Sequence, residues 1–221
     1  MGYEERYRET EHVFGEAPEP VVSEFAHMID RSGAVLDVGA GQGRNALFLA
    51  GLGLQVDALE PTLAGSETIA SVVEKKGLSV RVVRMRLEEL ADVAAPYAAV
   101  VAVGLIPVST RGQIAELPER LVGLLADGGL LFVTGFMTDE PGLERRAQRW
   151  TPVARNSYLN DDGDTRTFLE SGEMRSLFGD FDIVHYYEGM RSEDANGAGA
   201  TERHAVVEAV FRKTCGGEGE R

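Results

Sequence analysis

The chain has 221 residues, of which 43% are hydrophobic and 26% charged, and its formal net charge is −14. These are globular values for a chain of one ordinary domain, and no hydrophobic run is long enough to cross a bilayer. The negative charge disfavours binding to nucleic-acid phosphates. The only cysteine, Cys215, leaves neither a disulfide framework nor a cysteine-based metal site, so we expect no metal. With no apolar signal core at its start, the chain is expected to be cytoplasmic.

The first 33 residues are expected to form an arm and a helix ahead of the main domain. Residues 3–13 mix acids, arginines and aromatic side chains, as in a short amphipathic helix or an ordered arm. From Pro20 onward, apolar residues recur on one helical face until Ser32-Gly33. This spacing predicts a helix that packs on the core.

Residues 35–50 carry the most informative pattern of the chain. Residues 35–38 form a short run typical of a buried parallel strand, and residues 46–50 continue as an apolar helix. Between them, residues 39–43 read Gly-Ala-Gly-Gln-Gly. Glycines at such a junction allow positive φ angles and let a ligand approach backbone N–H groups at the start of a helix. The turn is therefore predicted to bind a ligand.

The spacing of the glycines separates two classes of ligand. A dinucleotide-binding turn reads G-x-G-x-x-G, and Arg44 stands where its last glycine belongs. Two residues before the first glycine, Asp37 lies inside an apolar strand, where a carboxylate needs a hydrogen-bonding or charged partner. A ligand ammonium group would be such a partner.

A second acid follows at the end of the next predicted strand, residues 54–61. Glu60 stands about 20 residues beyond the glycine-rich turn, where a carboxylate can accept hydrogen bonds from both ribose hydroxyls of a nucleoside. Asp57 is an alternative, although strand alternation turns it to a different face. A solvated acid at the strand end is the simpler alternative for Glu60.

The rest of the chain alternates between predicted helices and strands. Thr62 opens a helix, and further strands are expected at residues 78–83, 97–103 and 130–136, with a helix capped by Ser109-Thr110 before the last of these. Residues 137–170 read as a long irregular insertion, a type of segment that often covers a functional site. Strands at 181–187 and 203–213 follow, joined by a mobile turn at 190–202. Because no helix separates these two strands, they should pair antiparallel.

This order predicts an α/β fold. We expect a Rossmann-like, doubly wound, mostly parallel seven-stranded sheet with an antiparallel last strand. The expected organisation is an arm and helix at residues 1–33, which are candidates for a lid, a main domain at 34–213 and a flexible tail at 214–221. In such a sheet a ligand binds at the carboxyl ends of the strands.

The run from Asp37 to Gly43 resembles the first motif of class I methyltransferases that use S-adenosylmethionine. Residues 41–50 resemble the tellurite-resistance-type branch in particular. The resemblance covers about residues 12–213 and implies binding of S-adenosylmethionine and release of S-adenosylhomocysteine. It implies donor-binding roles for the following residues: Asp37, Gly39, Ala40, Gly41, Gly43, Asn45, Glu60, Pro61, Met85, Arg86, Leu87, Val103 and Gly104. At Arg86 the family usually has an acid that contacts the adenine amino group.

The acceptor is expected to meet the donor at the loop that begins at Gly104, again by resemblance. The substrate-side candidates are Tyr7, His12, Leu105, Tyr158 and Arg191, of which Tyr7 and His12 belong to a possible flap. His185, at the end of the sixth strand, is the histidine best placed by topology to act as a general base. Tellurite-type members place a histidine before the arginine that aligns with Arg191, and Met190 replaces it here, which argues against a metalloid substrate.

The sequence thus favours transfer of a methyl group to a small-molecule acceptor through an oxygen, nitrogen, sulfur or selenium nucleophile. A regulatory protein that binds the donor without catalysis is an alternative, encouraged by Arg86. An NAD- or FAD-dependent oxidoreductase is a weaker one because of Arg44. The expected partner is a small molecule and neither nucleic acid nor membrane, and the protein is expected to be a monomer or a homodimer.

Overall fold

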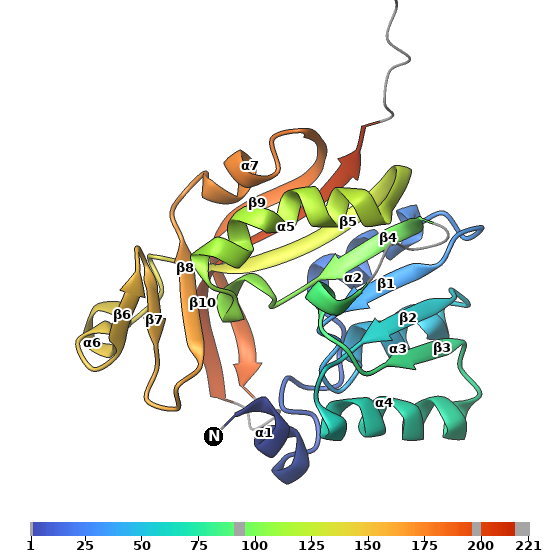
Figure 1. Ribbon diagram of the computed structural model, residues 1–221, viewed down its shortest axis with the longest axis horizontal. Coiled ribbons are helices and arrows are strands. Elements are labelled where there is room, and N and C mark those ends of the chain that lie inside the picture. Colours follow the sequence, from blue (N-terminus) through green and yellow to red (C-terminus); the bar gives the residue numbers. More distant parts are fainter. Residues whose placement is uncertain (1, 91–95, 196–199, 215–221) are drawn as a thin grey trace, which may run out of the picture.

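The computed structural model describes residues 2–90, 96–195 and 200–214 (Figure 1). Five parallel strands form the centre of the sheet, in the order β3-β2-β1-β4-β5. Their bounds are β1 Val35–Val38, β2 Val56–Leu59, β3 Val80–Val83, β4 Tyr97–Ala102 and β5 Leu125–Met137. Beyond β5, β10 (Ala200–Lys213) runs antiparallel, and β9 (Phe181–Ala195) pairs antiparallel with β10. The expected sheet with an antiparallel last strand is confirmed.

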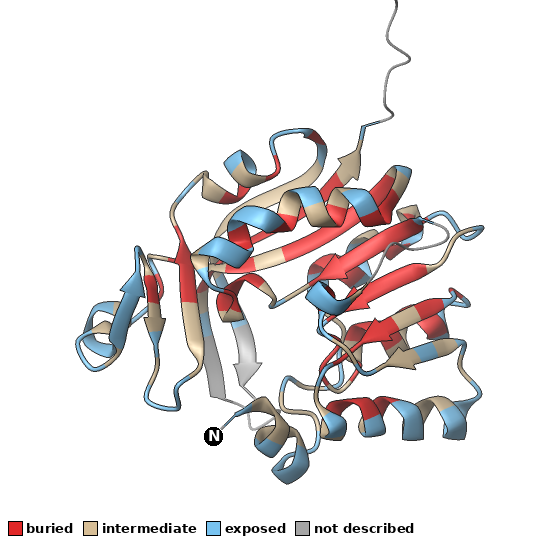
Figure 2. Ribbon diagram, viewed as in Figure 1, coloured by how far each residue is buried: buried red, intermediate tan, exposed pale blue. Residues whose placement is uncertain are grey.

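Helices cover both faces of this sheet, because side chains of successive strand residues alternate between the two faces. Leu36 and Val38 pack with α5 (Arg111–Leu124) and α7 (Glu173–Leu177) in one apolar cluster. Val35 packs in a second cluster with α2 (Pro20–Phe25), α3 (Arg44–Gly51) and α4 (Leu63–Lys76). Strands β1 and β4 are buried along their whole length, which explains their largely apolar sequences, whereas β3 at the edge of the sheet is only partly buried (Figure 2).

Capping groups set the starts of the two longest helices. The hydroxyl of Thr62 accepts a hydrogen bond from the Gly65 N–H at the start of α4. Thr110 and Gln113 form a reciprocal capping box at the start of α5. Short 3₁₀ turns, Ala26–Met28, Leu87–Glu89 and Ile106–Val108, follow α2, β3 and β4 respectively.

The expectation of an irregular insertion at 137–170 was wrong. The segment forms α6 (Leu143–Ala147) and the strands β6 (Thr151–Ala154), β7 (Ser157–Leu159) and β8 (Thr165–Leu169), and β8 extends the sheet at the end of β5. The buried hydroxyls of Ser157 and Thr167 lie 2.7 Å apart, and Thr167 also donates to the Ser109 carbonyl. Strands of three to five residues are too short for a clear periodicity in the sequence.

The mobile turn expected at 190–202 was also wrong, because β9 continues to Ala195 and β10 begins at Ala200. Cross-strand pairing within the hairpin outweighs the low strand propensity of its glycine, alanine and acidic residues. The tail expected at 214–221 lies, apart from Thr214, outside the described residues, and the division at residues 33 and 34 stays a prediction.

The N-terminal helix α1 (Tyr3–Glu9) lies between two distant parts of the chain (Figure 1). On one side, Glu4 accepts hydrogen bonds from the N–H groups of Leu63 and Ala64 at the start of α4. On the other, Arg6 pairs with Asp162 at 3.1 Å in the turn between β7 and β8. The arm therefore joins the start of α4 to the turn between β7 and β8.

Candidate functional site

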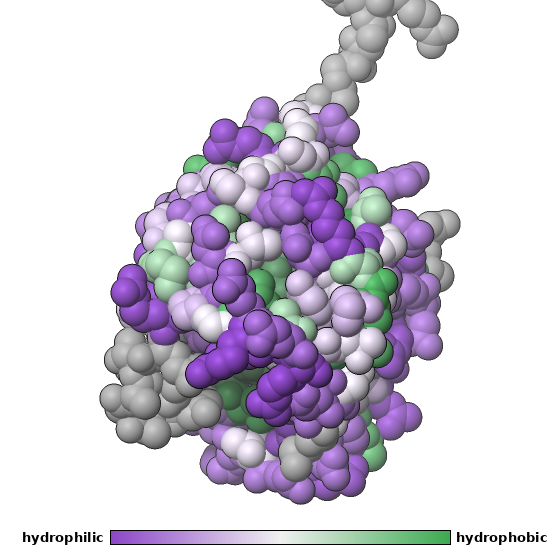
Figure 3. Space-filling view, turned by 90° about the vertical axis from the view of Figure 1, so that its left-hand side faces the viewer, coloured by the Kyte–Doolittle hydropathy of each residue, from purple (hydrophilic) through white to green (hydrophobic). Residues whose placement is uncertain are grey.

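A cavity of about 1520 Å³ lies at the carboxyl ends of the parallel strands. Its lining comes from the arm, the glycine-rich turn, the ends of β2, β3 and β4, and the β8 and β10 strands. Small-molecule sites commonly measure roughly 300–1,000 Å³. This cavity can therefore hold two ligands side by side. Figure 3 shows apolar surface at the floor of a hollow that hydrophilic side chains border.

The glycine-rich turn follows β1 directly, and its backbone needs glycine. Gly41 and Gly43 have φ angles of 60° and 93°, a region that other residues rarely adopt. A side chain on Gly43 would also lie 2.8 Å from the Ile69 side chain of α4. The turn can therefore pack closely on α4 while its backbone faces the cavity.

Asp37 is the most unusual group at this end of the sheet. Its side chain is buried, it accepts a hydrogen bond from the Ala46 N–H, and its Oδ2 has no hydrogen-bond partner among the described residues. Burial raises the pKa of Asp37 to about 7, although the Ala46 N–H and Arg44 oppose the shift. A buried carboxylate oxygen without a partner is costly, so the site fits a cationic or hydrogen-bonding ligand group.

Glu60 lies across the turn at the end of β2 and is also buried. Its Oε2 accepts a hydrogen bond from the Gly41 N–H at 2.7 Å, and its Oε1 accepts from the Thr62 N–H at 2.8 Å. Burial raises its pKa, although these bonds oppose the shift. Asp57 faces elsewhere, bonded to Arg81 and to the Tyr97 hydroxyl, so the expected difference in facing between the two acids is confirmed.

The non-glycine side chains of the turn hold the arm. Gln42 accepts from the Val13 N–H at 2.8 Å and donates to the Thr10 carbonyl at 2.9 Å. Arg44 forms an ion pair with Glu19, and Asn45 Oδ1 accepts from the Glu19 N–H at 2.8 Å. The expected donor-site residue Asn45 thus lines the cavity and also fixes the chain that covers it.

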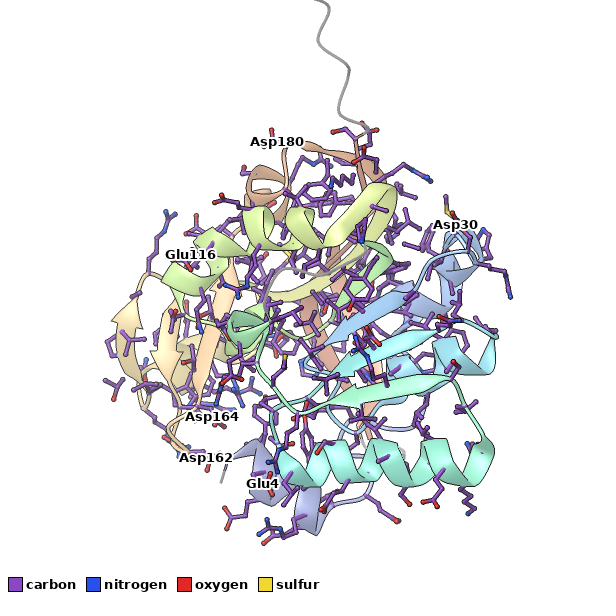
Figure 4. The ribbon with its side chains drawn as sticks, turned by 45° about the vertical axis from the view of Figure 1, so that its right-hand side comes forward. Glu4, Asp30, Glu116, Asp162, Asp164 and Asp180 are labelled. Atoms are coloured by element: carbon purple, nitrogen blue, oxygen red, sulfur yellow. The ribbon has the colours of Figure 1, made fainter. Side chains whose placement is uncertain are left out.

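Charged groups of the arm and the insertion meet above the cavity. Arg6 lies 3.1 Å from Asp162 and 3.9 Å from Asp164, and the guanidinium of Arg166 lies over the ring of Tyr3. Figure 4 shows Asp162 and Asp164 beside the N-terminal helix, whose Glu4 faces α4. We call these contacts between α1 and the β7–β8 turn the clasp.

Tyr7 of the same helix approaches the glycine-rich turn. A Cβ on Gly41 would lie 3.0 Å from the Tyr7 hydroxyl. Burial and the negative charge of Glu60 both raise the pKa of Tyr7, so its hydroxyl stays neutral and can donate a hydrogen bond at pH 7. The arm thus brings a polar group to the donor half of the cavity.

The cavity brings together most of the residues that the sequence nominated. The donor-side candidates that line it are Gly39, Ala40, Gly41, Asn45, Glu60, Pro61, Met85, Arg86, Leu87, Val103 and Gly104. The substrate-side candidates that line it are Tyr7, His12, Leu105 and Arg191. Asp37 lies buried beneath the turn, and Gly43 caps α3.

Two candidates lie away from the lining among the described residues. His185 packs against the Phe25 ring, with 4.8 Å between the ring centroids, and its Nε2 lies 3.4 Å from Oε1 of the lining residue Glu208, so its role as a base stays a prediction. Tyr158 packs against Trp150 and Phe168 inside the insertion. Helix α2 thus covers His185, and an aromatic cluster that the sequence did not reveal holds Tyr158 away from the cavity.

Among the charged residues of the lining that sequence reasoning missed are Glu208 and Arg166. Glu208 lies in an apolar strand in the same way as Asp37, and that was a usable signal. Arg166 enters the cavity only because β8 joins the sheet beside β5. No group of three or more metal-ligating side chains occurs within the described ranges, and no helix there is long and apolar enough to span a membrane.

Comparison with known proteins gives a consistent result. Residues 35–129 match a family model described as a methyltransferase domain. A search of curated proteins finds no match. Among solved structures, TehB from Haemophilus influenzae has a TM-score of 0.71 at 18% identity, over 96% of this chain and 67% of that one.

Two further structures cover most of both chains. One is the 1,6-didemethyltoxoflavin-N1-methyltransferase of Burkholderia thailandensis, solved with 1,6-didemethyltoxoflavin and S-adenosylhomocysteine bound. Its TM-score is 0.66 at 21% identity, over 89% of this chain and 78% of that one. The CcbJ methyltransferase of Streptomyces caelestis has a TM-score of 0.67 at 18% identity, over 96% of each chain. At these identities the structural likeness concerns the fold.

The matched domain, the sheet order and the site at the strand ends agree with one another. Residues 35–129 match a methyltransferase domain, and the chain shares the fold of the S-adenosylmethionine-dependent methyltransferases to which it is similar, TehB among them.

Proposed function

We propose that this protein transfers a methyl group from S-adenosylmethionine to a small organic acceptor. The observation that carries the proposal is the unpartnered Oδ2 of Asp37, buried at the end of β1 beneath a glycine-rich turn. A bound donor with an ammonium group would give that carboxylate a charged partner.

The donor's other parts have matching groups nearby. Glu60 would accept hydrogen bonds from the ribose hydroxyls, and the lining residues Met85 and Leu87 would flank the base. The donor supplies a methyl group on a sulfonium, so the protein's contribution is to position the reactants and exclude water. A large set of catalytic side chains is not required.

The acceptor half of the cavity supports a small molecule. Apolar side chains such as Leu105 and Phe136 line it, and the arm and the insertion limit its size. The net charge of −14 would repel a nucleic acid. Methylation of a small molecule, as the name of the toxoflavin-type relative indicates for that protein, fits this enclosure.

The arm is proposed as the cover of the donor. Gln42, Arg44 and Asn45 hold residues 10–19 against the turn, and Tyr7 reaches Gly41. An arm in this position would shield the reacting groups from water and slow the release of the donor.

Calorimetric titration with S-adenosylmethionine, S-adenosylhomocysteine and NAD tests the proposal. Both sulfur nucleosides should bind at micromolar concentrations and NAD should not. Preference for NAD, or no binding of the sulfur nucleosides, would contradict it. Formation of S-adenosylhomocysteine with a library of hydroxyl, amine and thiol compounds then separates an enzyme from a donor-binding regulator, because the regulator would bind without turnover.

A further inference from the structure

Glu208 is a buried carboxylate in the cavity that the donor site does not use. It is 4% exposed, it lines the cavity, and it lies in the middle of β10. A carboxylate in the interior of a sheet requires compensation by charge or hydrogen bonds. Its surroundings therefore indicate what it can bind.

The partners of Glu208 leave one of its oxygens available. Oε1 forms an ion pair with Arg191 and lies 3.4 Å from His185 Nε2. Among the described residues, Oε2 has no hydrogen-bond partner. The Tyr187 hydroxyl would lie 2.7 Å from a Cβ on Gly189, and the Arg191 guanidinium lies 4.2 Å from the Tyr187 ring centroid.

Glu208 is also close to the expected position of methyl transfer. It stands directly opposite Thr134 of β5 in the antiparallel register, so the two side chains share one face. The Thr134 hydroxyl in turn accepts a hydrogen bond from the Gly104 N–H at 3.0 Å. Adjacent strands lie about 4.8 Å apart, so Glu208 is two strands, or about 10 Å, from the end of β4. One aromatic ring with a polar substituent spans that gap.

The neighbouring groups define the ligand chemistry. Arg191 neutralises the charge of Glu208, so a further cation is not needed, whereas an uncharged N–H or O–H can donate to Oε2. Phe136 and Val206, which line the same part of the cavity, offer an apolar surface to the body of the ligand.

We propose that Glu208 binds the acceptor by accepting a hydrogen bond through Oε2, and that the acceptor is a neutral aromatic or heterocyclic molecule with a hydroxyl or N–H group. Arg191 acts as a positioning residue that holds Glu208. This inference rests on the proposed function, since it concerns the acceptor half of the same cavity.

Matched probes test the assignment on protein saturated with S-adenosylhomocysteine. Phenol and indole each donate one hydrogen bond, whereas anisole and N-methylindole have similar shapes and donate none. Measured by ligand-observed NMR, phenol and indole should bind about 10-fold more tightly than their methylated counterparts, as expected for a hydrogen bond to a charged group. Benzylamine and benzoate test a cationic and an anionic acceptor.

Variants locate the effect. Glu208→Gln should weaken the preference for phenol over anisole, and Glu208→Leu should abolish it. Glu188→Gln is the matched control, because Glu188 lies on the same hairpin and bonds to Ser171 and Gly172, outside the cavity lining. All three variants should bind S-adenosylhomocysteine as the wild type does.

Equal binding of phenol and anisole by the wild type, no binding of any probe, tighter binding of benzoate or benzylamine, or an unchanged preference in Glu208→Leu would each overturn the assignment. If the Glu208 variants did not fold, the preference of the wild-type protein for phenol over anisole would by itself decide whether the assignment stands. Failure of the wild type to bind S-adenosylhomocysteine would instead count against the proposed function, and the probes can then be compared on the ligand-free protein.

Discussion

The donor half of the cavity takes its shape from backbone geometry at the ends of β1 to β4, whereas the acceptor half depends on side-chain pairs between distant segments. At the donor half, the glycine-rich turn, Asp37 and Glu60 lie within 24 residues of one another in the sequence. At the acceptor half, Arg191 of β9 meets Glu208 of β10. A local motif can identify the donor, while the acceptor is determined by contacts that need not appear in any motif.

The largest effect is expected at Asp37. Asp37→Asn preserves the shape of the side chain but removes the charge that would pair with a ligand ammonium group. Loss of one partner of a buried charged pair should lower the affinity for S-adenosylhomocysteine by about 100-fold. Calorimetric titration measures this change, and an unchanged affinity would remove Asp37 from the donor site.

The same variant should change how stability depends on pH. The pKa of an aspartate carboxyl is 3.8 in the unfolded chain, and that of Asp37 is about 7 in the folded protein, so the folded chain binds the extra proton between these values. The free energy of unfolding of the ligand-free protein should therefore lose a contribution from Asp37 as the pH rises from about 4 to 7, with no further change above 7. Asparagine does not titrate, so the free energy of unfolding of Asp37→Asn should not show this decrease between about pH 4 and pH 7.

Urea unfolding of both proteins across this pH range is the measurement. The stability of the variant relative to the wild type should increase toward pH 7 and then level off. Curves that stay parallel across the range would show that Asp37 is already ionised in the folded protein near pH 4.

A smaller effect is expected at Glu60. Glu60→Gln keeps one acceptor oxygen but loses the charge, so the affinity for S-adenosylhomocysteine should fall by about 10-fold. Asp57→Asn is the matched control on the same strand, because Asp57 bonds to Arg81 and Tyr97 outside the cavity lining. Equal losses in both variants would indicate a general effect on β2 and not a role in donor binding.

The smallest effect is expected at the clasp. Arg6→Ala removes the pairs with Asp162 and Asp164, and the Arg6 and Asp162 side chains are 28% and 41% exposed. Exposed pairs contribute at most about 1 kcal/mol, so dissociation of S-adenosylhomocysteine should accelerate by no more than about fivefold. Stopped-flow experiments measure this rate. Increasing salt screens the exposed pairs and should therefore accelerate dissociation from the wild type toward the rate of the variant.

Arg149→Ala is the control for the clasp, because its pair with Asp161 lies within the insertion. It should leave the dissociation rate unchanged. A similar acceleration in Arg149→Ala, or a wild-type rate that is independent of salt, would mean that the clasp does not govern release of the donor.

Much of the fold could be predicted because its signals are local. Residues 35–38 and 97–102 are buried on both faces of the sheet, and a continuous apolar run directly reflects that environment. Thr62 and Thr110 mark helix starts through hydrogen bonds within a few residues. The hairpin of β9 and β10 extends further than expected because strand pairing can overcome a weak local preference.

The sequence by itself determined the donor half of this protein: the strand, the glycine turn, Asp37 and Glu60 follow from close spacing and from the backbone conformations that only glycine adopts readily. For the acceptor half, the sequence nominated single residues such as Leu105 and Arg191, and only the tertiary structure decided how that half is assembled. It brought β8 alongside β5, turned Glu208 and Arg191 toward one cavity, packed His185 against Phe25 and joined α1 to the insertion. The physical reason is that these contacts join segments far apart in the chain. Their contribution to the free energy of folding arises only when the sheet brings those segments together.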